Sequence, residues 1–159
     1  MLVALVLVAG SSATANAQTT PAPMPELRAD LIVGHRPAIQ VGAGVQIPAG
    51  IYVRLGLDGA DGMATGARTA GTSSRADARV DLLARFLLDP FRQRAYGLSV
   101  GGGLSLRAEP GERARPLLLV ALDVEGRRSA RGVAPALQVG VGGGLRLGVV
   151  LRRAARRAR

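Results

Sequence analysis

The chain has 159 residues, of which 48% are hydrophobic and 20% charged, and its formal net charge is +10. This length fits one domain with one core or one barrel. All 21 basic residues are arginine, cysteine is absent, and His35 is the single histidine. These counts exclude disulfide bonds, thiolate metal sites and a cysteine nucleophile, and they leave little room for a histidine-rich metal site.

The first residues have the pattern of an export signal. Residues 2–9 are apolar without interruption, and residues 15–17 (Ala-Asn-Ala) follow the small-x-small rule for cleavage. The apolar run is shorter than the roughly 20 residues that a membrane-spanning helix needs. We expect a signal peptide over 1–17, a lead-in rich in proline and threonine over 18–26, an antiparallel β-domain over 27–153 and a basic tail over 154–159.

From residue 27 onward, apolar residues alternate with polar residues or glycine, and this period of two predicts β-strands. The alternating stretches are 27–33, 39–47, 51–58, 75–89, 96–107, 118–125 and 133–153. A tight turn is expected at 48–50, and a loop rich in glycine, alanine, threonine and serine over 59–74. The last stretch is either one long strand or a hairpin that turns at 142–144. The predicted fold is all-β, an antiparallel up-and-down meander or barrel of six to eight strands.

The stretch 75–89 admits two interpretations. As a strand, it places a ladder of alternating charges on one face, namely Arg75, Asp77, Arg79, Asp81, Arg85 and Asp89. As a helix, it would align Leu82, Leu83 and Phe86 on one side, with Asp81 and Arg85 spaced as a supporting pair. The strands predicted on both sides favour the strand.

The apolar phase of the predicted strands contains no charged residue, and two architectures satisfy this pattern. In a soluble sandwich or lipocalin-like barrel the apolar face forms the core. In an outer-membrane barrel it meets lipid, while paired polar side chains fill the narrow lumen. Repeated glycines on the polar phase favour the second, because they make room for arginine side chains. We expect a lumen charge network made of Arg54, Arg79, Asp81, Arg85, Asp123, Glu125 and Arg146.

The leader, the amphipathic hairpins and the glycine-rich polar phase of residues 27–153 resemble small bacterial outer-membrane β-barrel proteins. The resemblance is architectural, so no functional residue of a family is carried over. It implies an outer-membrane location with the 59–74 loop outside and the short turns on the periplasmic side. All four aromatic residues lie near two of those short turns, where they predict an interfacial girdle: Tyr52, Phe86, Phe91 and Tyr96.

The sequence shows no recognisable catalytic or cofactor site, so we do not expect an enzyme. The glycine triplets lack the lysine of a phosphate-binding loop, and Ser99 and Ser105 have no histidine in a triad-like context. The carboxylates of Asp77 and Asp81 alternate with arginines on the same face, so we interpret them as ion-pair partners. No cofactor, metal or small-molecule substrate is predicted.

The end of the chain is strongly basic. We expect Arg152, Arg153, Arg156 and Arg157 to contact anionic lipid headgroups or the phosphates of lipopolysaccharide. The export signal and the scarcity of aromatics argue against nucleic acid as the partner. The expected function is structural or interactive, in the outer membrane. The alternative is a soluble periplasmic lipocalin-like module that binds an apolar ligand.

Overall fold

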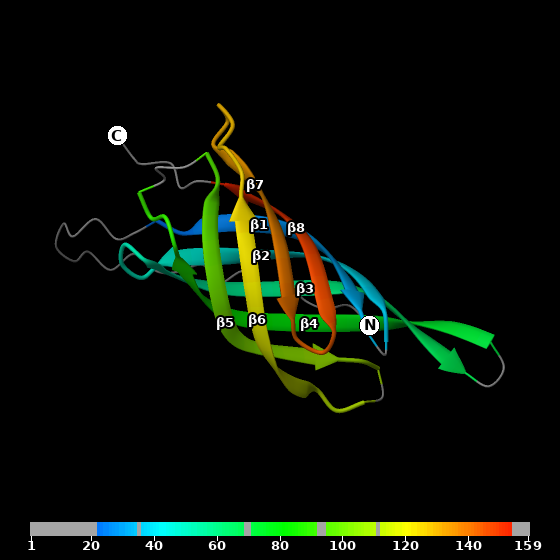
Figure 1. The fold of residues 1–159 in the computed structure, drawn as a ribbon. Helices are drawn as coiled ribbons and strands as arrows, with labels where there is room; N and C mark the ends of the chain where they lie inside the picture. The colour runs from blue at the N-terminus through cyan, green and yellow to red at the C-terminus, as the bar shows by residue number, and fades with distance from the viewer. Residues whose placement is uncertain (1–21, 35, 69–70, 92–94, 111, 154–159) are drawn as a thin grey trace, which may run out of the picture.

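The computed structural model describes residues 22–34, 36–68, 71–91, 95–110 and 112–153. They form eight strands (Figure 1): β1 (Met24–Val33), β2 (Ala38–Pro48), β3 (Val53–Arg68), β4 (Gly71–Leu87), β5 (Gly97–Ala108), β6 (Arg115–Glu125), β7 (Val133–Val141) and β8 (Leu145–Arg153). The expected signal peptide (1–17) and basic tail (154–159) lie outside the described residues. In the described ranges, no helix is long and apolar enough to cross a membrane.

The strands form a closed antiparallel barrel in which each strand pairs with its neighbour in sequence and β8 pairs with β1. In the closing register, Leu27 lies opposite Leu151 and Leu31 opposite Leu147. Closure leaves no sheet edge unpaired along the barrel wall. The predicted all-β, antiparallel up-and-down fold is confirmed, at the upper end of the expected strand number.

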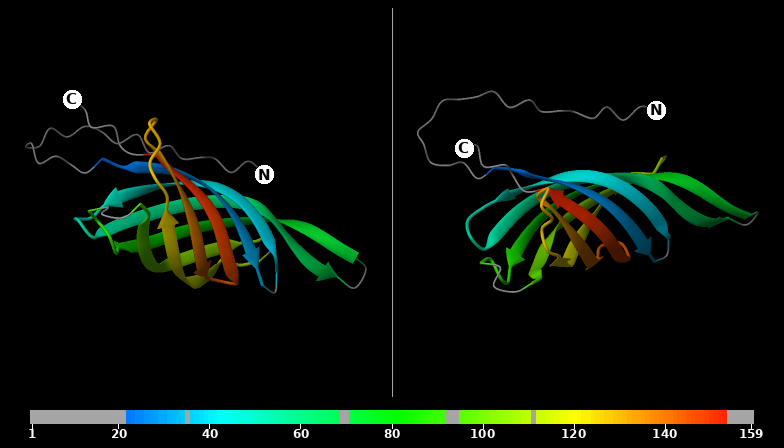
Figure 2. Two further views of the ribbon diagram at one scale, coloured as in Figure 1. Left: turned by 45° about the horizontal axis from the view of Figure 1, so that its top comes forward. Right: turned by 90° about the horizontal axis from the view of Figure 1, so that it is seen from above.

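We call the rim where β1 begins and β8 ends the termini end, and the opposite rim the hairpin end. The hairpin end carries the connections 34–37 and 109–114, the turn 142–144 and the long β3–β4 hairpin. The termini end carries the connections 49–52, 88–96 and 126–132. Figure 2 shows the β3–β4 hairpin reaching beyond the barrel at its own rim.

The prediction of a loop over 59–74 was wrong, because the described residues of this segment continue β3 and β4 as a paired hairpin. Thr65 lies opposite Ser74 and Arg68 opposite Gly71. Residues 59–64 still pair with β2, whose first residue, Ala38, lies opposite Ala64. Thr65 donates to the Pro37 carbonyl, and beyond it β3 and β4 pair with each other. The sequence predicted a loop here because glycine, alanine, threonine and serine dominate the segment, a composition typical of loops.

Residues 75–87 belong to strand β4, so the strand interpretation of this stretch is confirmed and the helical one is wrong. The hairpin alternative for the last stretch is also confirmed. Its turn uses Gly143 and Gly144, with φ angles of 73° and 148° that side chains other than glycine rarely adopt. At the other end of the chain, β1 begins at Met24, three residues before the expected start at Leu27.

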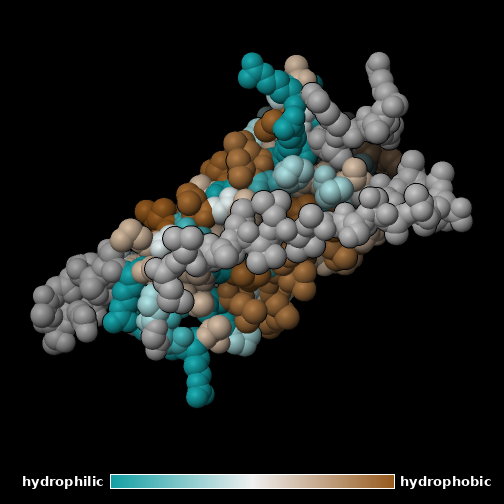
Figure 3. Space-filling view, turned by 180° about the vertical axis from the view of Figure 1, so that it is seen from behind, coloured by the Kyte–Doolittle hydropathy of each residue, from teal (hydrophilic) through white to brown (hydrophobic). Residues whose placement is uncertain are grey.

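The barrel turns its apolar phase outward and its polar phase inward. Exposed large hydrophobic residues occur on all eight strands, for example Leu27, Ile39, Leu82 and Leu118. In the space-filling view of Figure 3, hydrophobic side chains gather over the middle of the visible face and hydrophilic ones toward its ends. Six of the buried apolar residues form two small clusters, Ile32, Ala38 and Ala64 in one, and Leu83, Leu119 and Ala121 in the other.

Candidate functional site

Charged side chains fill the interior of the barrel. In the described part of the chain, seven arginines and seven carboxylates lie buried or half-buried on the inner face of the strands, and we call these fourteen residues the lumen network. They are Arg28, Arg54, Arg79, Arg85, Arg107, Arg146 and Arg152, with Glu26, Asp30, Asp58, Asp77, Asp81, Asp123 and Glu125. Their formal charges cancel, so the net charge of +10 belongs to the rest of the chain.

Near the termini end, Arg152 of β8 joins two carboxylates. Its Nε atom lies 2.9 Å from Glu26 Oε2 on β1, and its Nη2 atom lies 2.7 Å from Asp123 Oδ1 on β6. Arg85 of β4 approaches the other oxygen of Asp123 at 3.2 Å. Arg54, at the mouth, lies 3.2 Å from Glu125. All of these contacts except that between Arg152 and Glu26 link strands that are not neighbours in the sheet.

The centre of the lumen holds a continuous chain of ion pairs. Arg28 lies between Asp30 and Asp58, at 2.8 and 2.9 Å. Asp30 also binds Arg79, which lies 3.0 Å from Asp81. Arg146 then approaches Asp81 at 2.7 Å. Because Arg85 reaches Asp58 at 3.5 Å, the central chain and the cluster at the termini end form one network.

Amide side chains and glycines complete the interior. Gln46 donates to Glu26, and Gln138 both donates to Asp123 and accepts from Arg28. A side chain at Gly148 would overlap the Asp30 carboxylate, and one at Gly44 would overlap that of Asp58. Gly44 and Gly148 therefore leave the space that the carboxylates of Asp58 and Asp30 occupy.

The structure places all seven residues of the expected lumen network inside the barrel or at its mouth, in contact with one another through the pairs above. They are Arg54, Arg79, Asp81, Arg85, Asp123, Glu125 and Arg146. Besides Arg152, sequence reasoning did not assign six further members to the network: Glu26, Arg28, Asp30, Asp58, Asp77 and Arg107. Glu26 was expected in the lead-in. It lies two residues before Arg28, so the alternation of side chains along a strand was the signal that could have placed both on the inner face.

The structure contradicts the expectation that Arg152 contacts a lipid headgroup. The Arg152 side chain is 4% exposed and binds Glu26 and Asp123 inside the barrel, so it does not reach a lipid headgroup. Its neighbour Arg153 points outward and is exposed. Arg156 and Arg157 lie outside the described residues.

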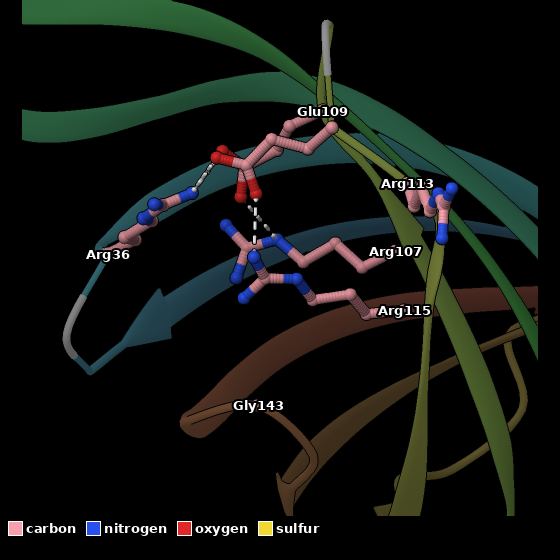
Figure 4. Close-up of a pocket in the computed structure, with 7 residues that line it drawn as sticks. Arg36, Arg107, Glu109, Arg113, Arg115 and Gly143 are labelled. Carbon is pink, nitrogen blue, oxygen red and sulfur yellow. Dashed lines mark hydrogen bonds and ion pairs between the residues drawn. The ribbon is translucent and has the colours of Figure 1, made fainter.

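The mouth at the hairpin end contains a pocket of about 310 Å³ (Figure 4). Its lining residues are Arg36, Arg107, Glu109, Glu112, Arg113, Arg115 and Gly143. Arg36 lies 2.6 Å from Glu109 and 3.0 Å from Glu112, and thereby ties the connection 34–37 to the connection 109–114. The hydrogen bond from Arg36, with the positive charges of Arg36, Arg115 and Arg75, lowers the pKa of the Glu112 carboxyl.

The charged residues inside the described barrel form arginine–carboxylate pairs and not a recognisable metal site. The described ranges contain no group of three or more histidine, cysteine, aspartate or glutamate residues arranged to hold a metal ion. Each central carboxylate instead faces at least one guanidinium. The arrangement can brace the barrel wall and close its lumen, because the side chains that cross the interior hold one another in place.

No protein-family model matches this chain, and a search of the curated proteins found no significant match.

Proposed function

We propose that the chain is an outer-membrane β-barrel protein with a closed polar interior and a structural or interaction role. The observation that carries the proposal is the polarity of the barrel. Its middle wall presents residues such as Leu57, Leu82 and Leu104 outward, each about half exposed, while Asp58, Asp81 and Arg85 are buried. A continuous apolar exterior of this extent marks a surface that meets lipid or another apolar partner.

The dimensions of the strands support the same proposal. Six of the eight strands have 9 to 12 residues, close to the roughly 9 to 11 that cross a bilayer in a tilted barrel. All four aromatic side chains are exposed near the termini end: Tyr52, Phe86, Phe91 and Tyr96. Tyrosine and phenylalanine at one rim form the kind of girdle that lies at a membrane interface.

The lumen network supports a role other than general diffusion. Arg146 and Asp81 meet across the interior, and Arg28, Arg79 and Arg85 occupy the space beside them. A lumen filled in this way leaves the outer wall, the two rims and the β3–β4 hairpin as the surfaces available for interaction. Lipid is the partner that the outer wall fits.

The basic end of the chain extends this proposal. Arg153 is exposed at the termini end, and Arg156 and Arg157 follow it in sequence. We propose that these three arginines contact anionic headgroups, because arginines near a negatively charged membrane surface each contribute about 1 kcal/mol of binding.

The alternative, a soluble periplasmic module with an apolar ligand inside, fits the interior poorly. A lipocalin-like site needs an apolar cavity, whereas the centre of this lumen is occupied by paired charges such as those of Arg28 and Asp30. Transferring so large an apolar exterior into water would also be unfavourable.

Cell fractionation tests the proposed function. An epitope tag inserted between Arg68 and Gly71 lies at the tip of the β3–β4 hairpin. We expect the tagged protein in the outer-membrane fraction, with the tag removed by protease added to intact cells. Recovery in the soluble periplasmic fraction would contradict the location. Recovery in the outer membrane with a protected tag would contradict only the orientation.

A further inference from the structure

The pocket at the hairpin end has the size of a small-molecule site and shares one lining residue, Arg107, with the lumen network that closes the barrel. It is formed by the connection 34–37, the connection 109–114 with the adjoining ends of β5 and β6, and the turn 142–144. Its volume of about 310 Å³ lies at the lower end of the range for ligand pockets. Figure 4 shows the side chains of Arg36, Arg107 and Arg115 gathered around Glu109.

Positive charge exceeds negative charge around this pocket. Four arginines line it against two carboxylates. Glu109 and Glu112 both bind Arg36, and Glu112 also binds Arg115 at 3.0 Å. Asp77 does not line the pocket but pairs with Arg107 at 2.7 Å. If Asp77 is included, four arginines face three carboxylates, which leaves one positive charge in excess. Across the described residues, Arg113 makes no ion pair within 4.0 Å.

Arg107 supplies a second, independent observation. Its side chain is 11% exposed, and its Nε atom donates to Asp77. Its Nη2 atom is buried and has no hydrogen-bond acceptor in the structure. A buried donor without an acceptor costs on the order of 1–3 kcal/mol, more when it is charged, so the contacts within the protein leave Arg107 incompletely compensated beside the pocket.

We propose that this pocket binds a phosphate group, either free or as a monoester. A guanidinium presents parallel N–H donors that match two oxygens of a phosphate, and the excess positive charge of the pocket favours an anion. Arg107, Arg113 and Arg115 are the binding residues. Glu109 and Glu112 are positioning residues, because they hold Arg36 and Arg115 at the edge of the pocket.

Glucose 1-phosphate is a suitable soluble probe, titrated calorimetrically into the full chain in zwitterionic detergent micelles. We expect saturable binding to one site. Arg115→Ala should weaken it about tenfold or more, because it removes a charge-assisted contact. Arg115 is largely exposed, so its loss leaves the fold intact. Arg128→Ala is the matched control, since it removes the same charge from an exposed position at the opposite rim.

A second arm identifies the source of the phosphate. Nanodiscs of phosphatidylcholine are compared with nanodiscs that also contain phosphatidic acid, a lipid with a phosphate monoester. If glucose 1-phosphate binds in nanodiscs of phosphatidylcholine alone but not in those with phosphatidic acid, the pocket binds the phosphate of a lipid. If glucose 1-phosphate binds equally well in both kinds of nanodisc, the natural ligand is a soluble phosphate compound. Absence of saturable binding to the unmodified chain, or equal weakening by Arg128→Ala and Arg115→Ala, would overturn the proposal. The titration in micelles does not depend on cellular location, so its failure is distinct from failure of the proposed function.

Discussion

Arg146 on β8 and Asp81 on β4 meet across the lumen, with 2.7 Å between Nη1 and Oδ2. The two strands lie four places apart in a closed barrel of eight, so this pair spans the full interior. Asp81 also binds Arg79, which continues the chain of charges to Asp30 on β1. The interior is therefore braced from wall to wall by side chains and not only by the strand ladder.

A lumen crossed in this way should not conduct ions. We expect the chain, reconstituted into planar lipid bilayers, to produce no discrete current steps, because Arg28, Arg79 and Arg146 occupy the path with their carboxylate partners. Regular single-channel steps from the unmodified protein would contradict the closed interior.

Two adjacent arginines of β8 should differ sharply in their contribution to stability. Arg152→Ala leaves Glu26 and Asp123 buried with fewer cationic partners, and we expect a loss of about 3–5 kcal/mol in the free energy of unfolding. Arg153→Ala, at an exposed position, should change it by less than about 0.5 kcal/mol. Urea unfolding in lipid vesicles measures both. Equal effects of the two substitutions would show that the register of β8 is different.

Two glycine substitutions test the space left for the carboxylates. Gly148→Ala places a methyl group against the Asp30 carboxylate and should destabilise the barrel by about 1–3 kcal/mol. Gly59→Ala is the matched control, because it faces outward into open space. It should be neutral or stabilise the strand by up to about 1 kcal/mol. A tolerated Gly148→Ala would mean that Asp30 can move without breaking its contacts with Arg28 and Arg79.

The apolar exterior can be tested with a single charge. Leu82 lies at mid-wall between Leu57 and Leu104, so Leu82→Arg should cost about 2–4 kcal/mol of stability in vesicles if the wall meets lipid. Ile51→Arg, in the exposed connection at the termini end, should cost no more than about 1 kcal/mol. In a water-facing wall, the two substitutions would have similar, small effects.

The ion pair between Arg36 and Glu112 should respond to acid. The pKa of Glu112 is lowered below its ordinary value of 4.5, mainly by the hydrogen bond from Arg36. A lowered folded-state pKa means that the contact stabilises the fold above pH 4.5 and is lost as the pH falls through the lowered pKa. Carbon NMR of the Glu112 carboxyl should give a midpoint below 4.5 that moves upward in Arg36→Ala. The control Arg128→Ala should leave it unchanged.

Much of the interior could be predicted from parity alone. Asp77, Arg79, Asp81 and Arg85 fall on the inner face because side chains of any strand alternate. Alternation is a local property, so it predicted β4 and the inward direction of Arg146 without knowledge of their neighbours. The polar-phase glycines indicated that large charged groups needed space, although not which groups.

The partners of those charges depended on barrel closure. Arg146 and Asp81 are 65 positions apart in the chain and meet only because β8 returns to β1, which places β4 on the opposite wall. The continuation of β3 and β4 through 59–74 was missed because glycine, alanine, threonine and serine dominate it, although 59–64 pair with β2 in the barrel wall. Arg152 and Arg153 are chemically identical neighbours in a basic run. Only the register that aligns Arg152 with Glu26 separates a buried, paired guanidinium from an exposed one.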